Sequence, residues 1–420
     1  MITGGLLARR TEIMGASAIR EILKAAAQPG MISLAGGVPA PESFPLHLIP
    51  GLLASVLEKY GPAALQYDPT EGFPPFREAA ARYLSANGVP ATADEVIIAS
   101  GSQGVLDGLG KILLNKGDLV VVESPTYLGA LQAFTPYEPS FIGLESDDDG
   151  PLPDSLETAI RSQRPKFVYL NPTFQNPTGR TMTLERRREV ARLIKQHDVL
   201  VVEDDPYGAL RFEGRPQPTL KSLAPENVVY LGTMSKILAP GLRLGFCAAP
   251  EPIRRWLVLA KQGVDLHANT LGQALAAEYL SGGHLETHLP KIIALYRSRR
   301  DAMLTALEKY FPSGFSWSKP EGGMFLWVAG PKGFDADRLY QRALERKAAI
   351  VPGRHFFPQP GQGRETMRLN FSMAAEDRID RAVKILADTI EEQAGAPGRS
   401  RVAVHLGPES RQAGEKGVAA

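Results

Sequence analysis

The chain has 420 residues, of which 44% are hydrophobic and 22% are charged, so it can bury large cores in roughly two or three structural units. Its 47 basic and 46 acidic side chains give a net charge of +1, which provides no electrostatic reason to bind nucleic acid or an anionic membrane. A single cysteine, Cys247, excludes an internal disulfide and a cysteine-rich metal centre, and no run approaches the roughly 18 apolar residues of a membrane span. Since Met1–Arg10 resembles no secretory signal, we expect a cytoplasmic protein. We also expect no metal site, because His284 and His288 have no third ligand nearby in the sequence.

We assign residues 1–44 to an N-terminal arm.

The first part of the chain with clear periodicity predicts an α/β fold. From residue 95 to residue 249, short apolar runs alternate with amphipathic stretches such as Leu184–His197. Strands that alternate with helices predict a largely parallel sheet, and continuous β-branched runs are typical of strands buried on both faces. The predicted strands are Glu95–Ala99, Asp118–Glu123, Lys166–Leu170, Val199–Glu203, Val228–Leu231 and Leu244–Ala248. Ligands bind beyond the carboxyl ends of such strands, so we expect the functional residues there.

The last third of the chain differs in pattern. It is mostly helical from Pro252 to Tyr310, and a smaller α/β part follows, with predicted strands at Gly323–Val328 and Met367–Phe371 and a helix near Asp377–Gln393. We therefore expect a large domain over residues 45–295 and a small domain over residues 296–393. Residues 394–420 are rich in Gly, Ala, Ser and Arg and lack apolar periodicity, which predicts a disordered tail.

Polar clusters follow four of the predicted strands. Ser100–Gly104 is a small-residue loop that opens a helix and offers N–H groups to a phosphate, and Asn171–Gly179 is a rigid turn with two Asn-Pro pairs. Asp204–Tyr207 and Thr233–Lys236 follow the next two strands, and Arg243 precedes the last. Each cluster alone is as typical of a turn or an ion pair as of a site. Together they place an anion loop, an acid, a tyrosine, a lysine and an arginine around one crevice.

These clusters carry a resemblance to a known family. The chain resembles the fold type I pyridoxal-phosphate aminotransferases of class I/II, and within them it is most similar to the 2-aminoadipate and kynurenine aminotransferase branch. The segments that carry the resemblance are Gly15–Arg20, Ile32–Pro45, Gln66–Arg77, Ser100–Gln103, Ser124–Tyr127, Asn171–Gly179, Glu203–Tyr207, Ser235–Gly245 and Arg368–Ser372. The resemblance implies a large domain with a mostly parallel seven-stranded sheet between helices, and a smaller α/β domain.

The resemblance also implies roles around pyridoxal 5'-phosphate. Lys236 would bind the cofactor covalently and move the proton of the substrate, since burial and nearby cations can lower the pKa of a lysine. Asp204 would keep the pyridine nitrogen protonated, and the family spacing to Tyr207 selects it over Asp205. Tyr207 and Asn176 would donate to the phenolic oxygen of the cofactor.

Further positions match the rest of the family site. The ring would stack on Tyr127, and the phosphate would lie among Ser102, Gln103, Thr233, Ser235 and Arg243. Tyr67 resembles a tyrosine that reaches the phosphate of the neighbouring subunit, which implies a homodimer with shared active sites. The substrate would contact Arg368, Asn176 and Gly37, with Arg368 as a bidentate partner of the α-carboxylate. Ser17 and Arg20 belong to a segment that covers the substrate in the resembling branch.

The predicted function is transfer of an amino group from an α-amino acid to a 2-oxo acid such as 2-oxoglutarate. The donor would be a 2-aminoadipate-like, aromatic or branched aliphatic amino acid. One alternative is a different pyridoxal-phosphate reaction on the same fold, such as β-elimination or decarboxylation. A less favoured alternative is a transcription regulator with an aminotransferase-like domain, because only about thirty residues precede Ser33, fewer than the ~50 of a usual extra domain.

Overall fold

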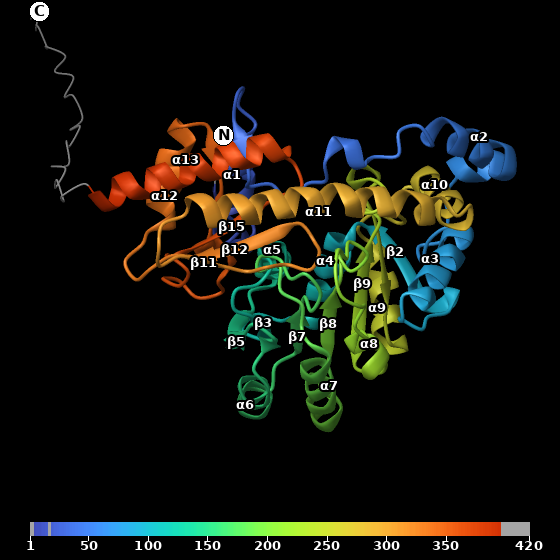
Figure 1. Cartoon of the computed structure of the whole chain (residues 1–420). Helices are drawn as coiled ribbons and strands as arrows, with labels where there is room; N and C mark the ends of the chain where they lie inside the picture. Colours follow the sequence, from blue (N-terminus) through green and yellow to red (C-terminus); the bar gives the residue numbers. More distant parts are fainter. Residues whose placement is uncertain (1–3, 16–17, 396–420) are drawn as a thin grey trace, which may run out of the picture.

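The computed structural model of the protein describes residues 4–15 and 18–395. Within them the chain forms a large α/β unit around one sheet and a smaller unit around an antiparallel sheet (Figure 1). Ser17 and most of the predicted tail, from residue 396 on, lie outside the described residues.

Seven strands in the order β2-β10-β9-β8-β7-β3-β4 form the large sheet. Their bounds are β2 (Val96–Ser100), β3 (Leu119–Glu123), β4 (Ser140–Leu144), β7 (Phe167–Leu170), β8 (Val201–Asp204), β9 (Val228–Thr233) and β10 (Leu244–Ala248). β10 pairs antiparallel with β2 and β9, and the other neighbouring pairs are parallel. The predicted mostly parallel seven-stranded sheet is therefore confirmed.

Each of the six predicted strands overlaps a strand of this sheet, but the sequence pattern did not reveal β4. That strand lies at the edge of the sheet, and most of its side chains are only half-buried. An edge strand does not need the continuous apolar run that marks a central strand. The predicted helix Leu184–His197 forms with the same bounds, as α7.

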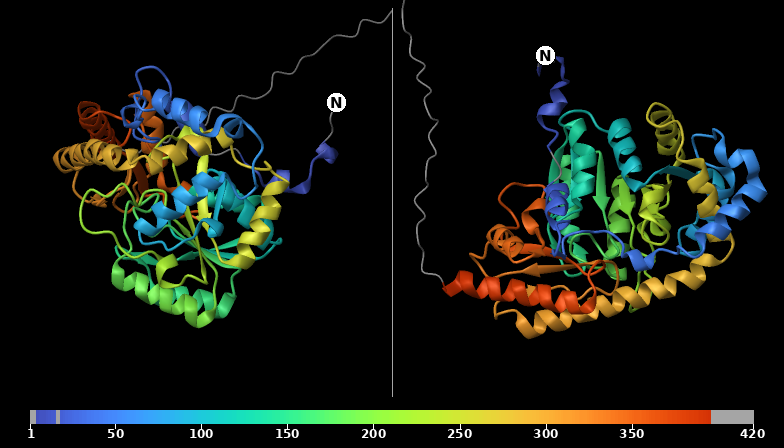
Figure 2. Two further views of the ribbon diagram at one scale, coloured as in Figure 1. Left: turned by 90° about the vertical axis from the view of Figure 1, so that its right-hand side faces the viewer. Right: turned by 90° about the horizontal axis from the view of Figure 1, so that it is seen from above.

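Helices cover both faces of the large sheet (Figure 2). The side chains of a strand alternate between faces, so Val120 and Val122 pack under α4, α5 and α9, whereas Val121 packs under α6 and α7. At the β2 end, α3 and α10 cover the same face as α7, and α2 packs on α10. The helix bounds are α2 (Ile49–Tyr60), α3 (Pro74–Ala86), α4 (Ser102–Leu113), α5 (Leu128–Phe134), α6 (Pro153–Gln163), α7 (Leu184–His197), α8 (Leu220–Leu223), α9 (Glu251–Gln262) and α10 (Thr270–Ser281).

The smaller unit is built around the antiparallel sheet β11-β12-β15-β14. Its elements are β11 (Ser316–Trp317), β12 (Phe325–Ala329), α12 (Ala336–Glu345), β14 (Val351–Pro352), β15 (Thr366–Asn370) and α13 (Glu376–Gly395). The arm joins this unit, because β1 (Ile32–Ser33) pairs in parallel with β13 (Ala348–Ala349), and α1 (Ala18–Ala26) lies beside β13. The arm thus leads into the space between the two sheets.

One long helix, α11 (His284–Tyr310), runs across the top of the large sheet to the smaller unit, where it packs against α13 (Figures 1 and 2). The predicted domain boundary at residue 296 falls inside this continuous helix. The division into residues 1–44, 45–295 and 296–393 stays a prediction.

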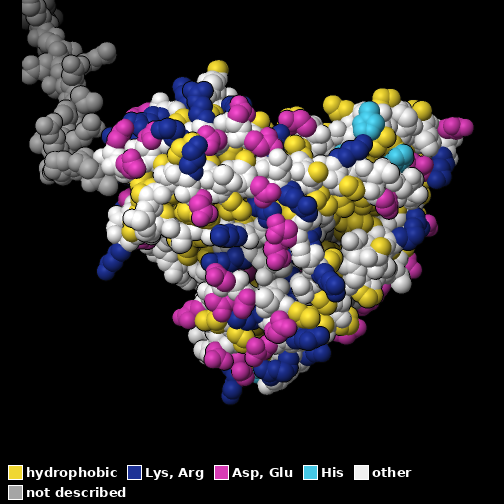
Figure 3. Space-filling view, viewed as in Figure 1, with side chains coloured by type: hydrophobic (Ala, Val, Ile, Leu, Met, Phe, Trp, Pro, Cys, Tyr) yellow, Lys and Arg dark blue, Asp and Glu magenta, His cyan; other side chains and the backbone are white. Residues whose placement is uncertain are grey.

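Two surface properties accompany the fold. None of the helices in residues 4–15 and 18–395 combines the length and apolar character needed to cross a membrane. Acidic and basic side chains are intermingled over the face drawn in Figure 3, including the part formed by α6 and α7. This mixture agrees with the net charge of +1.

Candidate active site

A cavity of ≈ 400 Å³ lies where the large sheet, the smaller unit and the arm meet. Residues at or after the carboxyl ends of β2, β3, β7, β8 and β9 form most of its wall. Arg243 precedes β10, but β10 runs antiparallel, so this residue comes to the same edge. The lining residues are Gly37, Val38, Ser102, Gln103, Tyr127, Leu128, Gly129, Gln132, Asn171, Asn176, Asp204, Pro206, Tyr207, Thr233, Ser235, Lys236, Arg243, Phe325 and Arg368.

Most of the predicted site residues line this one cavity. Among the predicted site residues whose side chains the structure describes, Tyr67 is the exception. Tyr67 lies outside it, with 78% of its surface exposed and its ring packed edge-on against His267. Arg20 belongs to α1, but its side chain and all of Ser17 lie outside the described part of the structure.

Asp204 is the buried acid of the cavity. It is the last residue of β8 and is 2% exposed, and its Oδ2 accepts a 2.7 Å hydrogen bond from the Tyr169 hydroxyl. Burial raises the pKa of Asp204 to about 7, although the Tyr169 hydrogen bond opposes the shift. Its other oxygen, Oδ1, is buried and has no hydrogen-bond partner among the described residues. A buried acceptor without a hydrogen-bond partner destabilises the folded protein, so we expect a bound ligand to donate a hydrogen bond to this oxygen.

Asn171 and Asn176 connect the neighbouring strand ends. The Asn171 side chain donates to the carbonyl of Asp204 and accepts from the backbone N–H of Asn176 at 2.6 Å. The Asn176 side chain in turn accepts from Arg368 at 2.8 Å and lies 3.5 Å from the hydroxyl of Tyr207. The two amides therefore fix the position of Asp204 and turn Asn176 toward the cavity.

Lys236 follows β9 and places its amine in the cavity, where it donates to the carbonyl of Gly37 at 3.0 Å. Desolvation, together with the nearby cations Arg243 and Arg368, lowers the pKa of Lys236 to about 8. At neutral pH a larger fraction of this lysine is therefore a neutral amine than in an ordinary lysine. A neutral amine is the form that acts as a nucleophile or a base.

Arg368 reaches the cavity from β15 of the smaller sheet. Its guanidinium donates to the side-chain oxygen of Asn176 at 2.8 Å and to the carbonyl of Ala35 at 2.7 Å, and its Nε is buried without a partner. The group is 2% exposed and lies 4.2 Å from the ring centroid of Phe325, so desolvation lowers its pKa to about 10. The cavity thus holds a buried cation that has no carboxylate partner in the described structure.

The opposite end of the cavity is suited to an anion. Ser102 and Gln103 form the first turn of α4, whose N-terminal N–H groups and dipole favour negative charge, and Arg243 lies beside this turn. Gly101 permits this approach: it has φ +78°, and a Cβ there would collide with the Arg243 guanidinium. Thr233 and Ser235 add hydroxyls 3.0 Å apart at the same end.

Aromatic residues complete the walls. Tyr127 precedes α5, and burial raises its pKa to about 12. Burial also raises the pKa of Tyr207, whose ring packs edge-on against Phe325 with the centroids 5.6 Å apart. Both hydroxyls therefore stay protonated and can donate hydrogen bonds near neutral pH.

Several lining residues were not identified from the sequence. Asn171 belongs to the turn that the sequence marks, and its position directly after a predicted strand was a usable signal. Val38, Leu128, Gln132 and Phe325 gave no such signal, because only the packing of the arm, α5 and the smaller sheet brings them to the cavity.

The residues present fit pyridoxal phosphate. The free Oδ1 of Asp204 suits a pyridinium N–H, the amine of Lys236 suits an aldehyde carbon, and the turn at Ser102 with Arg243 suits a phosphate. The seven-stranded α/β sheet with this set at its carboxyl edge is that of a fold type I pyridoxal-phosphate enzyme.

Comparison with known proteins defines the family. The family model for aminotransferase class I and II matches residues 47–386, and the chain belongs to this family. It is 46% identical to an aromatic-amino-acid aminotransferase from Thermococcus litoralis, over 90% of this chain and 93% of the relative. It is 41% identical to a 2-aminoadipate transaminase from Thermus thermophilus, over 90% and 94%. A solved kynurenine aminotransferase from Pyrococcus horikoshii aligns with a TM-score of 0.89 and 45% identity, covering 93% of this chain and 98% of that one.

The protein is therefore a pyridoxal-phosphate-dependent aminotransferase, as the sequence predicted.

Proposed function

We propose that the cavity binds pyridoxal 5'-phosphate, with Ser102, Gln103, Thr233, Ser235 and Arg243 for its phosphate, Tyr127 to stack on its ring and Asp204 to pair with the ring nitrogen. The support is the convergence of a desolvated lysine, a buried acid with a free oxygen, and a buried arginine on one ≈ 400 Å³ cavity. Pyridoxal phosphate supplies the electron sink that stabilises negative charge at the α-carbon of an amino acid. In this proposal Lys236 binds the cofactor.

Each chain residue then has a defined task. Asp204 would accept the ring N–H, and its negative charge would keep the ring nitrogen protonated. Tyr207 and Asn176 would donate hydrogen bonds to the phenolic oxygen. Lys236 would hold the cofactor and move the proton at the α-carbon of the substrate, a task for which its desolvated amine has a suitable pKa.

Arg368 orients the substrate. Its fork of donors suits the two oxygens of an α-carboxylate, and its burial strengthens that pairing. Asn176 and the backbone of Gly37 complete this end of the proposed substrate site, because both line the cavity beside Arg368. Ser17 and Arg20 remain proposed contacts of the substrate side chain, on the basis of their sequence pattern.

The proposed donors are aromatic amino acids, 2-aminoadipate and kynurenine, with 2-oxoglutarate as an acceptor. The support for the donors is similarity, because the names of the relatives carry aromatic amino acids, 2-aminoadipate and kynurenine. The apolar residues Val38, Leu128 and Phe325 on the cavity wall agree with a large side chain. We further propose that the reaction takes place in the cytoplasm, as the sequence indicates.

We also propose a homodimer with shared active sites. Tyr67 is 78% exposed, and other large apolar side chains such as Leu65, Trp256 and Val264 are exposed as well. Exposed apolar side chains that gather on one surface are typical of an interface. Mixing an inactive Tyr67→Ala variant with an inactive Lys236→Ala variant should restore part of the activity, since some heterodimers contain one intact site. No recovery despite verified subunit exchange would contradict a shared site.

The main test combines labelling and turnover. Borohydride reduction of the holoenzyme followed by peptide mapping should place the pyridoxyl group on Lys236, and a label on another lysine would contradict the assignment. A panel of aromatic, aminoadipate and branched donors with 2-oxoglutarate should give the matching 2-oxo acid and glutamate. Loss of carbon dioxide or of a β-substituent without a new amino acid would instead indicate decarboxylation or elimination.

A further inference from the structure

Helix α7 carries three consecutive arginines, and the middle one is fully buried. Arg187 shares the inner face of the helix with Val190, Ala191 and Ile194, whereas Arg188 is exposed. The spacing of these inner positions would suit an apolar residue at position 187. Burying a guanidinium is costly unless its donors are satisfied, so its partners must account for its presence.

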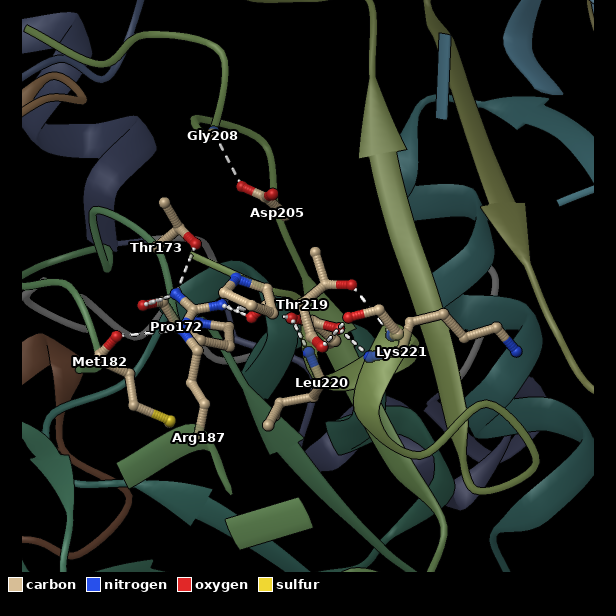
Figure 4. Close-up of polar contacts among 12 residues, drawn as sticks. Pro172, Thr173, Met182, Arg187, Asp205, Gly208, Thr219, Leu220 and Lys221 are labelled. Carbon is tan, nitrogen blue, oxygen red and sulfur yellow. Dashed lines mark hydrogen bonds and ion pairs between the residues drawn. The ribbon is translucent and has the colours of Figure 1, made fainter. Parts of the chain in front are cut away.

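The Arg187 guanidinium ties together the two ends of one loop (Figure 4). It donates to the carbonyls of Pro172 at 2.9 Å and Met182 at 3.0 Å, and to the hydroxyl of Thr173 at 2.8 Å. A fourth hydrogen bond reaches the carbonyl of Pro218 at 3.1 Å. We call residues 171–182 the asparagine loop. Its first and last turns are thus held by one side chain.

The same guanidinium faces β8. Its nitrogen lies 3.8 Å from the carboxylate of Glu203, which also accepts the backbone N–H groups of Leu220 and Lys221 at 2.9 and 2.7 Å. Glu203 directly precedes Asp204, and neighbouring residues of a strand point to opposite faces of the sheet. Arg187 therefore contacts, from the α7 face, the residue next to the acid that faces the cavity.

The asparagine loop carries both amides that shape the cavity. Asn171 holds the Asp204 carbonyl and the backbone N–H of Asn176, and it directly precedes Pro172, whose carbonyl Arg187 binds. A displacement of Pro172 therefore moves Asn171 and, through it, Asn176 and the end of β8. The path from Arg187 to the cavity contains only adjacent residues and hydrogen bonds.

We propose that Arg187 is a positioning residue for the cofactor site, which holds Asn176 and Asp204 in register from the opposite face of the sheet. This inference rests on the proposed function, since it assigns Asn176 and Asp204 to the cofactor. The role requires arginine, because a planar fork reaches four acceptors in different directions, whereas a lysine ammonium has three donors on a single nitrogen.

The test compares the holoenzymes of wild type, Arg187→Lys and a matched control, Arg300→Lys. Arg300 is 5% exposed and donates to the carbonyl of Pro320 at 2.7 Å, but it contacts no residue of the cavity lining. Arg187→Lys should weaken equilibrium binding of pyridoxal phosphate by about tenfold and shift the pH midpoint of the absorbance of the bound cofactor, because the groups that face its ring move. Arg300→Lys should lower the melting temperature but leave the affinity for pyridoxal phosphate and the pH midpoint of the absorbance unchanged.

Two outcomes would overturn the proposal. A folded Arg187→Lys variant with wild-type affinity and absorbance midpoint would make Arg187 a stabilising residue only. If that variant does not fold, Thr173→Val decides, because it removes one acceptor of Arg187 and leaves the guanidinium in place. This variant should shift the midpoint in the same direction by a smaller amount, and an unchanged midpoint would equally reject the role.

Failure of this inference is distinguishable from failure of the proposed function. If Lys236 carries no reducible cofactor in the wild-type enzyme, the proposed function itself is wrong. If the wild-type enzyme carries the cofactor on Lys236 but the variants at Arg187 and Thr173 behave like wild type, the proposed function stands and only the positioning role is rejected.

Discussion

The two walls of the cavity are built in different ways. The cofactor wall, formed by Asn171, Asn176, Asp204, Tyr207 and Lys236, comes from one sheet, and direct hydrogen bonds connect its two asparagines with each other, with Asp204 and with Tyr207. The substrate wall, formed by Gly37, Val38, Phe325 and Arg368, comes from the arm and the smaller sheet, and Arg368 is its only charged member.

This difference matches two requirements of a transaminase. The cofactor is the same in every turnover, so rigid groups that are already in place stabilise its charges without reorganisation. The donor and acceptor differ in size and charge, so their common carboxylate needs one fixed partner while the rest of the wall stays apolar. The comparison predicts that changes in the cofactor wall, and at the fixed carboxylate partner Arg368, affect all substrates severely. Changes that alter recognition of the substrate side chain should instead discriminate between substrates.

The largest effect is expected for Asp204→Asn. The amide removes the negative charge that keeps the ring nitrogen protonated, so kcat should fall by about three orders of magnitude for every donor, while the fold stays intact. Steady-state kinetics with an aromatic and an acidic donor checks this, with circular dichroism as the measure of folding.

Asp205→Asn is the matched control. Asp205 is the neighbouring acid, but it accepts from Tyr230 at 2.9 Å and from the Gly208 N–H at 2.8 Å, and it does not line the cavity. We expect a much smaller loss of kcat. A mild Asp204→Asn together with a severe Asp205→Asn would show that the assignment is shifted by one residue.

The next largest effect is expected for Arg368→Ala. Loss of the desolvated carboxylate partner should lower kcat/KM for all substrates alike. The loss should correspond to about 2–4 kcal/mol of transition-state stabilisation. Arg368→Lys should recover only part of the loss, because an ammonium cannot bind both carboxylate oxygens in parallel. Selective loss with one donor class would place Arg368 at the substrate side chain instead of the α-carboxylate.

How much of this site the sequence predicts depends on the wall. Asp204, Lys236 and Asn176 lie in polar clusters that follow strands with clear apolar runs, so strand ends and motif spacing sufficed to bring them together. Phe325 lies on a predicted strand of the smaller sheet, yet nothing in that strand indicates which face meets the cavity. Tyr169 looked like a core residue of a strand, and its hydrogen bond to Asp204 depends on the register between β7 and β8. Contacts of this kind arise from packing between elements distant in sequence.

A third effect concerns pH. Because desolvation lowers the pKa of Lys236 to about 8, the neutral amine increases about tenfold per pH unit below that value and levels off above it. The rate at which the apoprotein captures pyridoxal phosphate, followed by stopped-flow absorbance, should show the same rise and plateau. The reaction of the same cofactor with free Nα-acetyl-lysine is the control, and its rate should keep rising to about pH 10. A protein profile that follows the free amine would contradict a desolvated lysine.

The smallest and most selective effect is expected for Arg20→Ala. Arg20 lies on α1, which packs beside β13 at the start of the arm that leads to Gly37, and the sequence pattern places it near the substrate side chain. Removing a guanidinium that pairs with a distal carboxylate should lower kcat/KM for 2-aminoadipate and 2-oxoglutarate by about tenfold, while aromatic donors, which lack that charge, should lose about twofold or less. Lys24→Ala is the control, because Lys24 lies on the same helix and pairs with Glu21 at 2.7 Å, so both substrate classes should be unaffected. Equal losses of kcat/KM with acidic and aromatic substrates would show that Arg20 has a structural role and does not recognise the distal carboxylate of the substrate.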